Sequence, residues 1–249
     1  MHPLDALAVF GAGLAAGTIN TIVGSGSLVT FPTLLALGYP AVLANVTNTV
    51  GIVPGSLSGA VAYRRELKGQ KRRLLVLGSA SLAGGLLGSG LLLALPGSVF
   101  RRIVPALILL ACLLVVVQPR LSRWLAEHRE HREHGGASLW ATVFATGIYG
   151  GYFGAAQGVI LIALLATFLT DELNRLNATK NVLALIANGT AALLFISVSH
   201  VAWAVAGFLA VGAILGGQLG GLIGRRLPPA LLRVVIVCVG VTVAVLLLV

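Results

Sequence analysis

Two glycine-rich interruptions decide the fold of this chain: GTINTIVGSGS at positions 17–27 and GIYGGYFGAAQG at positions 147–158. Each precedes a short apolar segment, at 28–37 in the first case and at 159–169 in the second. A helix needs about 20 apolar residues to cross a bilayer, so neither short segment crosses alone. Glycine lets the backbone turn and approach a ligand closely. We therefore expect two broken helices at matching places in the chain.

The composition is that of an integral membrane protein. Hydrophobic residues make up 57% of the 249 residues, charged residues make up 10%, and the mean hydropathy is +0.99. A soluble domain carries roughly 25% charged residues, which is what a water-facing surface needs. The stretches 74–100, 103–117, 182–224 and 234–249 contain no charged residue. These features predict an all-α, polytopic helical bundle in the membrane.

The net charge of +10 follows from membrane topology rather than from nucleic-acid binding. Basic residues gather at the ends of apolar runs, above all at 64–73, and no basic face is interleaved with aromatic residues. No HExxH motif, paired intramembrane carboxylates or Ser/His/Asp set is evident, so we expect neither an enzyme nor a cofactor. The repeat EHREHREH at 127–134 fits a solvated segment better than a metal site.

The second half of the chain repeats the punctuation of the first. A shift of 132 positions places the GGxxG pattern of 84–88 on that of 216–220, and the NxT pattern of 45–47 on that of 177–179. Further upstream the shift is 130, with Gly24 falling on Gly154. We predict a first repeat at 1–117, a cytoplasmic linker at 118–136 and a second repeat at 137–249. The GGxxG glycines are expected to pack helices against each other.

Helices are expected at 4–23, 28–37, 41–63, 73–95 and 99–117, and again at 138–153, 159–169, 174–199, 201–224 and 229–249. The positive-inside rule places the loop 64–73, the linker and Arg225-Arg226 in the cytoplasm, and both termini outside. The halves then run in opposite directions, as inverted repeats with about 8–10 membrane segments. Orientation does not decide whether the short helices are re-entrant or cross completely.

Candidate binding residues lie in the two interruptions and where the following helices begin. Neutral amides and hydroxyls can donate hydrogen bonds to a dehydrated anion, and restarting helices turn a positive dipole end toward it. The candidate residues are Asn20, Gly24, Ser25, Gly26, Ser27, Asn45, Thr47, Asn48, Gly154, Gln157, Gly158, Asn177, Thr179, Lys180 and Asn181. Two interpretations of Lys180 stay open: a functional cation inside the membrane, or a lysine snorkelling to the headgroups.

The stretch 17–26 followed by Pro32, the helix opening Ala44-Asn45-Val46-Thr47-Asn48, and their echoes in the second half resemble the TauE/SafE family. The resemblance covers essentially the whole chain. It implies a transporter in a bacterial inner membrane that carries sulfite or small sulfur-containing organic anions. The residues themselves leave an anion channel and a non-transporting accessory subunit open, although paired broken repeats favour a carrier that works by alternating access.

Acidic residues are missing from the depths of the apolar spans. Proton-coupled carriers commonly relay protons through buried carboxylates, so carboxylate-mediated proton coupling is not expected. A negative cell interior drives a monovalent anion outward by about 2.3 kcal/mol per 100 mV. We therefore expect electrogenic anion export. The sequence leaves the substrate's identity and the oligomeric state open.

Overall fold

The computed structural model describes residues 2–127 and 136–223, together with Val234, Val237, Cys238 and Val241. This part of the chain is helical and contains no strand. Its helices are α1 (Pro3–Ile22), α2 (Ser27–Ala36), α3 (Ala41–Ala62), α4 (Lys71–Ala94), α5 (Gly97–Glu127), α6 (Gly136–Tyr152), α7 (Gln157–Phe168), α8 (Leu173–Val198) and α9 (Trp203–Ile223). The predicted polytopic all-α fold is confirmed.

The observed boundaries agree with the predicted ones to within two residues, except at α5. That helix continues to Glu127, ten residues beyond its expected end at 117. The first part of the predicted linker, 118–127, is therefore helical. Only the apolar part, Gly97–Val117, has the length and hydropathy of a membrane span. Two parts of the sequence lie outside the described residues: the rest of the EHREHREH repeat, from 128 on, and most of the predicted last helix.

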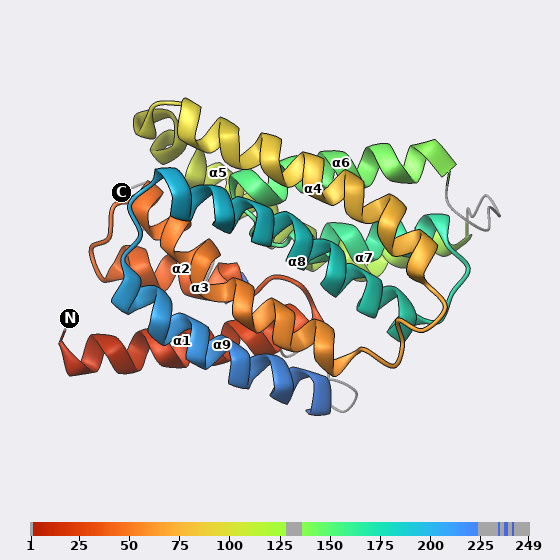
Figure 1. Ribbon diagram of the computed structural model, residues 1–249, viewed down its shortest axis with the longest axis horizontal. Helices are drawn as coiled ribbons and strands as arrows, with labels where there is room; N and C mark the ends of the chain where they lie inside the picture. Colours follow the sequence, from red (N-terminus) through yellow and green to blue (C-terminus); the bar gives the residue numbers. More distant parts are fainter. Residues whose placement is uncertain (1, 128–135, 224–233, 235–236, 239–240, 242–249) are drawn as a thin grey trace.

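Five described helices are long and apolar enough to cross a bilayer: α1, α4, the apolar part of α5, α8 and α9. In contrast, α2 has 10 residues and α7 has 12. At 1.5 Å per residue they measure about 15–18 Å, which is roughly half of the 30 Å hydrocarbon core. Each forms a hairpin with the helix before it, because the chain turns back and returns to the end from which it came (Figure 1).

The two hairpin turns begin in the same way, with a glycine in the left-handed region. Gly24 has a φ of +91° and Gly154 a φ of +77°, a region that glycine enters without steric cost. The Gly24 N–H donates to the carbonyl oxygen of Ile19 at 3.0 Å, and the Gly154 N–H donates to that of Tyr149 at 3.1 Å. Bonds of this kind close a helix and satisfy its last carbonyls. Glycine therefore ends α1 and α6 in the same way.

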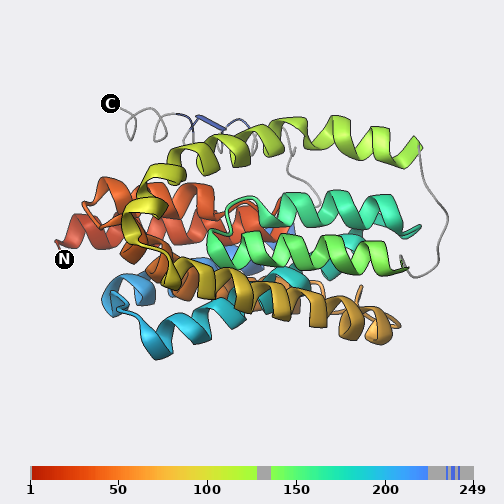
Figure 2. The same cartoon turned by 90° about the horizontal axis from the view of Figure 1, so that it is seen from above.

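Glycines also let helices from different halves pack closely. Helix α1 lies along α9, and α6 lies along α4 (Figure 1). A Cβ atom at Gly88 would lie 2.0 Å from the carbonyl oxygen of Ile148, and one at Gly216 would lie 2.1 Å from that of Leu14. The predicted packing role of the GGxxG glycines is confirmed. Helix α5 covers another face of the bundle and packs against α7 (Figure 2).

The two ends of the bundle differ in charge. The loop 64–70, the start of α8 and the start of α6 lie at one end, whereas the N-terminus and the turn at 199–202 lie at the other (Figure 1). At the first end Asp171 binds two arginines, Arg73 at 2.7 Å and Arg175 at 2.9 Å. Six basic residues lie in the stretch 64–73 at this end, so we call it the basic end. Its ion pairs tie the start of α4 to the start of α8.

Candidate functional site

The two hairpins meet at Gly24 and Gly158, deep in the bundle. The Gly158 N–H donates to the Gly24 carbonyl oxygen at 3.0 Å. A Cβ atom built on either residue would lie 2.5 Å from the Cα atom of the other, closer than real Cβ contacts allow. Only glycine at both positions therefore permits this crossing. The crossing places the start of α7 against the turn after α1.

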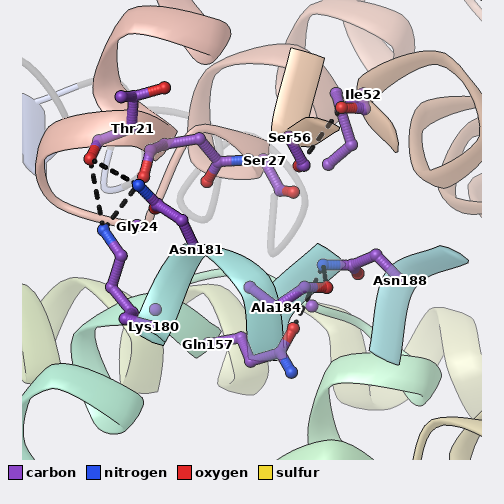
Figure 3. A pocket seen from close by; sticks show the side chains of 13 residues that line it. Thr21, Gly24, Ser27, Ile52, Ser56, Gln157, Lys180, Asn181, Ala184 and Asn188 are labelled. Carbon is purple, nitrogen blue, oxygen red and sulfur yellow. Dashed lines mark hydrogen bonds between the residues drawn. The ribbon is translucent and has the colours of Figure 1, made fainter. Parts of the chain in front are cut away.

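A small cavity lies beside the crossing, and most of its polar lining comes from the hairpins and from α3 and α8 (Figure 3). Its lining residues are Asn20, Thr21, Gly24, Ser27, Ile52, Ser56, Gly154, Gln157, Gly158, Lys180, Asn181, Ala184 and Asn188. The space open to the centre of a water molecule is about 20 Å³. One water needs about 10–15 Å³ on this measure. An anion that enters so small a space loses most of its hydration shell.

Several lining residues are separated by the intervals at which the sequence repeats. Ile52 and Ala184 lie 132 positions apart, as do Ser56 and Asn188. Two further pairs lie 130 positions apart: Gly24 with Gly154, and Ser27 with Gln157. Figure 3 shows Ser27, Ile52 and Ser56 on one side of the cavity and Gln157, Ala184 and Asn188 on the other. Matching positions of the two halves thus face each other.

Lys180 supplies the charge in the cavity. Its side chain is 1% exposed, and its Nζ atom donates to the carbonyl oxygens of Asn20 at 3.2 Å and Thr21 at 3.4 Å. These carbonyls belong to the last turn of α1, whose dipole presents its negative end there. Lys180 is therefore held inside the bundle. The interpretation as a lysine that snorkels to the headgroups is wrong.

Two asparagines of α8 fix the same end of α1. The side-chain amide of Asn177 donates to the Thr21 carbonyl oxygen at 3.1 Å, and that of Asn181 donates to the same oxygen at 3.4 Å. Figure 3 shows the Nζ of Lys180 and the amide of Asn181 converging on this carbonyl. Helix α8 is thus hydrogen-bonded to the end of α1 through Asn177, Lys180 and Asn181. These hydrogen bonds link α8 to the segment that precedes the turn at Gly24.

Gln157 supplies an uncommitted hydrogen-bond donor. Its side chain is 1% exposed, and its Oε1 atom accepts from the Asn188 amide at 3.2 Å. Its Nε2 atom is buried and has no hydrogen-bond partner among the described residues. Buried polar atoms are nearly always paired, and leaving one unpaired costs about 1–3 kcal/mol. The orphaned donor therefore points to a ligand or water as its partner.

Sequence comparison identifies the family to which this chain belongs. The sequence profile described as "Sulfite exporter TauE/SafE" matches residues 9–247. The chain belongs to the TauE/SafE family. This membership, with the membrane-length helices, identifies a membrane transporter of a bacterial type, and no catalytic family is indicated.

Relatives in this TauE/SafE family include the "Probable membrane transporter protein YfcA" of Escherichia coli K12, which is 29% identical over 96% of this chain and 88% of its own length. A "Probable membrane transporter protein" of Haemophilus influenzae is 28% identical over 94% of this chain and 91% of its own length. The "Probable membrane transporter protein ORF9" of a Sinorhizobium species is 26% identical over 96% of this chain and 91% of its own length. No solved structure matches the chain.

Eight of the fifteen predicted site residues line the cavity of this TauE/SafE transporter: Asn20, Gly24, Ser27, Gly154, Gln157, Gly158, Lys180 and Asn181. The other seven do not line it: Ser25, Gly26, Asn45, Thr47, Asn48, Asn177 and Thr179. Several of these tie segments of the chain together. The Gly26 N–H donates to Asn20 Oδ1 at 3.0 Å, and Asn48 Oδ1 accepts from the Thr30 hydroxyl.

Three more of the seven connect segments that are far apart in the sequence. The Asn45 amide donates to the Tyr152 carbonyl oxygen at 3.0 Å, at the end of α6. The Thr47 hydroxyl accepts from the Ala202 N–H at 3.1 Å, and the Thr179 hydroxyl donates to Gln70 at 2.9 Å. Asn45 therefore holds the end of α6 as Asn177 holds the end of α1.

Five lining residues were missed by the sequence interpretation: Thr21, Ile52, Ser56, Ala184 and Asn188. The sequence did contain a pattern from which Ser56 in α3 and Asn188 in α8 could have been predicted. Asn188 lies eight residues after Lys180, and Ser56 lies eight residues after Asn48. Positions four and eight apart share one face of a helix, so the cavity face could have been extended by two turns from the predicted cluster.

Proposed function

We propose that this transporter moves small anions, sulfite or small sulfur-containing organic anions, across the bacterial inner membrane by alternating access, in the direction of export. The observation that carries the proposal is the cavity at the hairpin crossing. Lys180, with a buried ammonium, and Gln157, whose amide N–H donors have no partner among the described residues, both line it, and none of the described lining residues is acidic. Such a lining attracts a dehydrated anion and repels a cation.

The site also has the setting that secondary transporters use. Binding near the middle of the membrane, between broken helices of two related halves, is characteristic of these proteins. The cavity of about 20 Å³ must widen before an anion of several atoms can enter. Such widening requires the residues of the first hairpin to move away from those of the second. Because the hairpins enter from opposite ends of the bundle, the cavity can open toward either side of the membrane.

We further infer that residues 1–117 and 137–249 are inverted repeats joined by a cytoplasmic linker. The proposal is supported by lining residues 130 and 132 positions apart, and by hairpins that enter from opposite ends. The basic end would face the cytoplasm, with the N- and C-termini outside. Cysteine accessibility in right-side-out vesicles tests this: a cysteine at Gly69 should be protected, and one at Gly38 labelled.

The proposed transport is tested in proteoliposomes. Uptake of labelled sulfite, sulfate, thiosulfate and a sulfonate is measured with wild type, Gln157→Ala and Lys180→Ala, at clamped potentials of both signs. Saturable, potential-sensitive flux that either substitution abolishes would support a carrier with its site in this cavity. Flux that does not saturate would indicate a channel. No flux of any anion through correctly folded protein would refute the proposal.

A further inference from the structure

The charge balance of the cavity is set by Lys180. It is the one charged residue among the 13 that line the cavity, and none of the 13 is acidic. The chain has seven acidic residues, and the nearest in sequence, Asp171 and Glu172, precede α8 at the basic end. Asp171 is engaged there by Arg73 and Arg175. The cavity wall therefore carries a single positive charge that no lining carboxylate balances.

The hydrogen bonds of Lys180 leave room for one further acceptor. A lysine ammonium has three N–H donors. Two of them reach the carbonyl oxygens of Asn20 and Thr21, and no third acceptor is found among the described residues. Backbone carbonyls are dipoles and do not neutralise a charge. A buried charge without a counter-ion is costly, so an anion bound beside Nζ removes a large penalty.

The remaining donors of the lining are neutral. Gln157, Ser27 and Asn181 can hydrogen-bond an anion, but they add no formal charge. One negative charge on the anion is thus balanced by Lys180, and a second one is not. A bound anion exchanges water for these lining groups, so its second charge loses solvation without gaining a counter-charge. Desolvation of an unbalanced charge therefore acts against a dianion.

We propose that the cavity selects singly charged oxyanions, such as hydrogensulfite and monosulfonates, over dianions such as sulfate, and that the loaded site is electrically neutral while the empty site carries the positive charge of Lys180. This inference rests on the proposed function and narrows its substrate class. It also assigns the voltage sensitivity of transport to one step, the return of the empty site. A negative cell interior draws the empty, positive site toward the cytoplasm, and this return step drives export of the next anion.

Methanesulfonate and sulfate form the matched pair of probes. Both present a tetrahedral sulfur with oxygens, and they differ in that a methyl group replaces one charged oxygen. We measure their saturable fluxes in proteoliposomes at a single pH, so that the charge of the protein is the same for both. The methanesulfonate flux should exceed the sulfate flux by about 100-fold or more, because an unbalanced buried charge costs several kcal/mol and each 1.4 kcal/mol is tenfold.

Two substitutions separate charge from shape. Lys180→Arg keeps the charge and should keep the preference for methanesulfonate. Lys180→Gln removes the charge, so the flux ratio of the two anions should fall by at least about tenfold. If Lys180→Gln does not fold or carries no flux, the voltage dependence of the wild-type protein still tests the proposal. Methanesulfonate–methanesulfonate exchange should then ignore the clamped potential, whereas net methanesulfonate flux should respond to it.

The outcomes distinguish this inference from the function on which it rests. Equal wild-type fluxes of methanesulfonate and sulfate would overturn charge selection while leaving anion transport standing. Exchange as voltage-sensitive as net flux would overturn the neutral loaded site. A Lys180→Gln protein that folds, transports and still prefers methanesulfonate would show that Lys180 does not select. Absence of any anion flux would refute the proposed function itself.

Discussion

The backbones of Gly24 and Gly158 touch, with the N–H of Gly158 donating to the carbonyl oxygen of Gly24 at 3.0 Å and no room for a side chain at either residue. This contact joins the turn after α1 to the first turn of α7. Both glycines also line the cavity. The stability and the activity of the protein should therefore both depend on this pair.

Gly24→Ala should destabilise the protein through two effects. Alanine strains the positive φ of +91° by about 1–2 kcal/mol, and its methyl group forces the crossing apart at a further cost of about 1–3 kcal/mol. Gly38→Ala is the matched control, because Gly38 has a φ of +84° but open space around its Cβ position. Thermal unfolding in detergent should show the larger loss for Gly24→Ala. Equal losses would mean that the crossing does not constrain the hairpins.

Helix packing gives a second pair of substitutions within α4. Gly88→Ala places a methyl group against the backbone of α6 and should cost about 1–3 kcal/mol of unfolding free energy. Gly90→Ala, two residues further on, meets no atom within 4 Å. It should be neutral or slightly stabilising because alanine favours helix. The same unfolding measurement tests both, and a harmless Gly88→Ala would contradict the close approach of α4 and α6.

The ion pairs of Asp171 should make stability depend on acidity. Burial raises the pKa of the Asp171 carboxyl, but the hydrogen bond from Arg73 and the charges of Arg175 and Arg73 outweigh burial and lower the pKa below its ordinary value. A lowered pKa stabilises the fold at pH values above the unfolded pKa. That stabilisation is lost as the pH falls through the folded pKa.

Asp171→Asn removes this contribution. At neutral pH the variant should be less stable than wild type by about 1.5–3 kcal/mol, the range of hydrogen bonds to charged groups. On acidification below the folded pKa of Asp171, the difference between the two proteins should vanish. Unfolding midpoints recorded from neutral to acid pH check this. A difference that stays constant with pH would show that the ion pairs contribute nothing.

Gln157→Glu should suppress anion transport while keeping the side-chain size. The introduced carboxylate would lie in the same cavity as Lys180 and balance its charge in place of the substrate. We expect at least a tenfold loss of flux at neutral pH. Gln218→Glu is the control, because Gln218 binds Ser58 and does not line the cavity. Unchanged flux in Gln157→Glu would place the substrate elsewhere.

Much of the architecture could be predicted from the sequence, because membrane helices obey local rules. A run of apolar residues must form a helix in lipid, where every backbone group needs a partner. Glycine and proline punctuation then marked the interruptions, which the structure places at 23–26 and 153–156. The end of α5 was predicted wrongly, since its helix continues past the uninterrupted apolar run, which ends at Val117, into a stretch of mixed polar and apolar residues that can also be helical.

The candidate site was predicted only in part. Its neighbourhood followed from polar residues beside broken helices, which explains why Gln157 and Lys180 were found. The sequence left Lys180 between two interpretations, because both need a lysine in an early turn of a helix. The tertiary structure decided between them, since only the position of α1 provides the carbonyls of Asn20 and Thr21 that hold the ammonium.

The sequence by itself thus determined a membrane-embedded helical protein with two broken helices, because hydropathy and glycine spacing act within single segments. The tertiary structure decided which polar residues share a cavity. It brings Ser56 to the same space as Asn188, and Gly24 to Gly158, across more than a hundred positions of chain. Contacts of this kind depend on how helices from the two halves cross, and no local pattern of residues encodes that crossing.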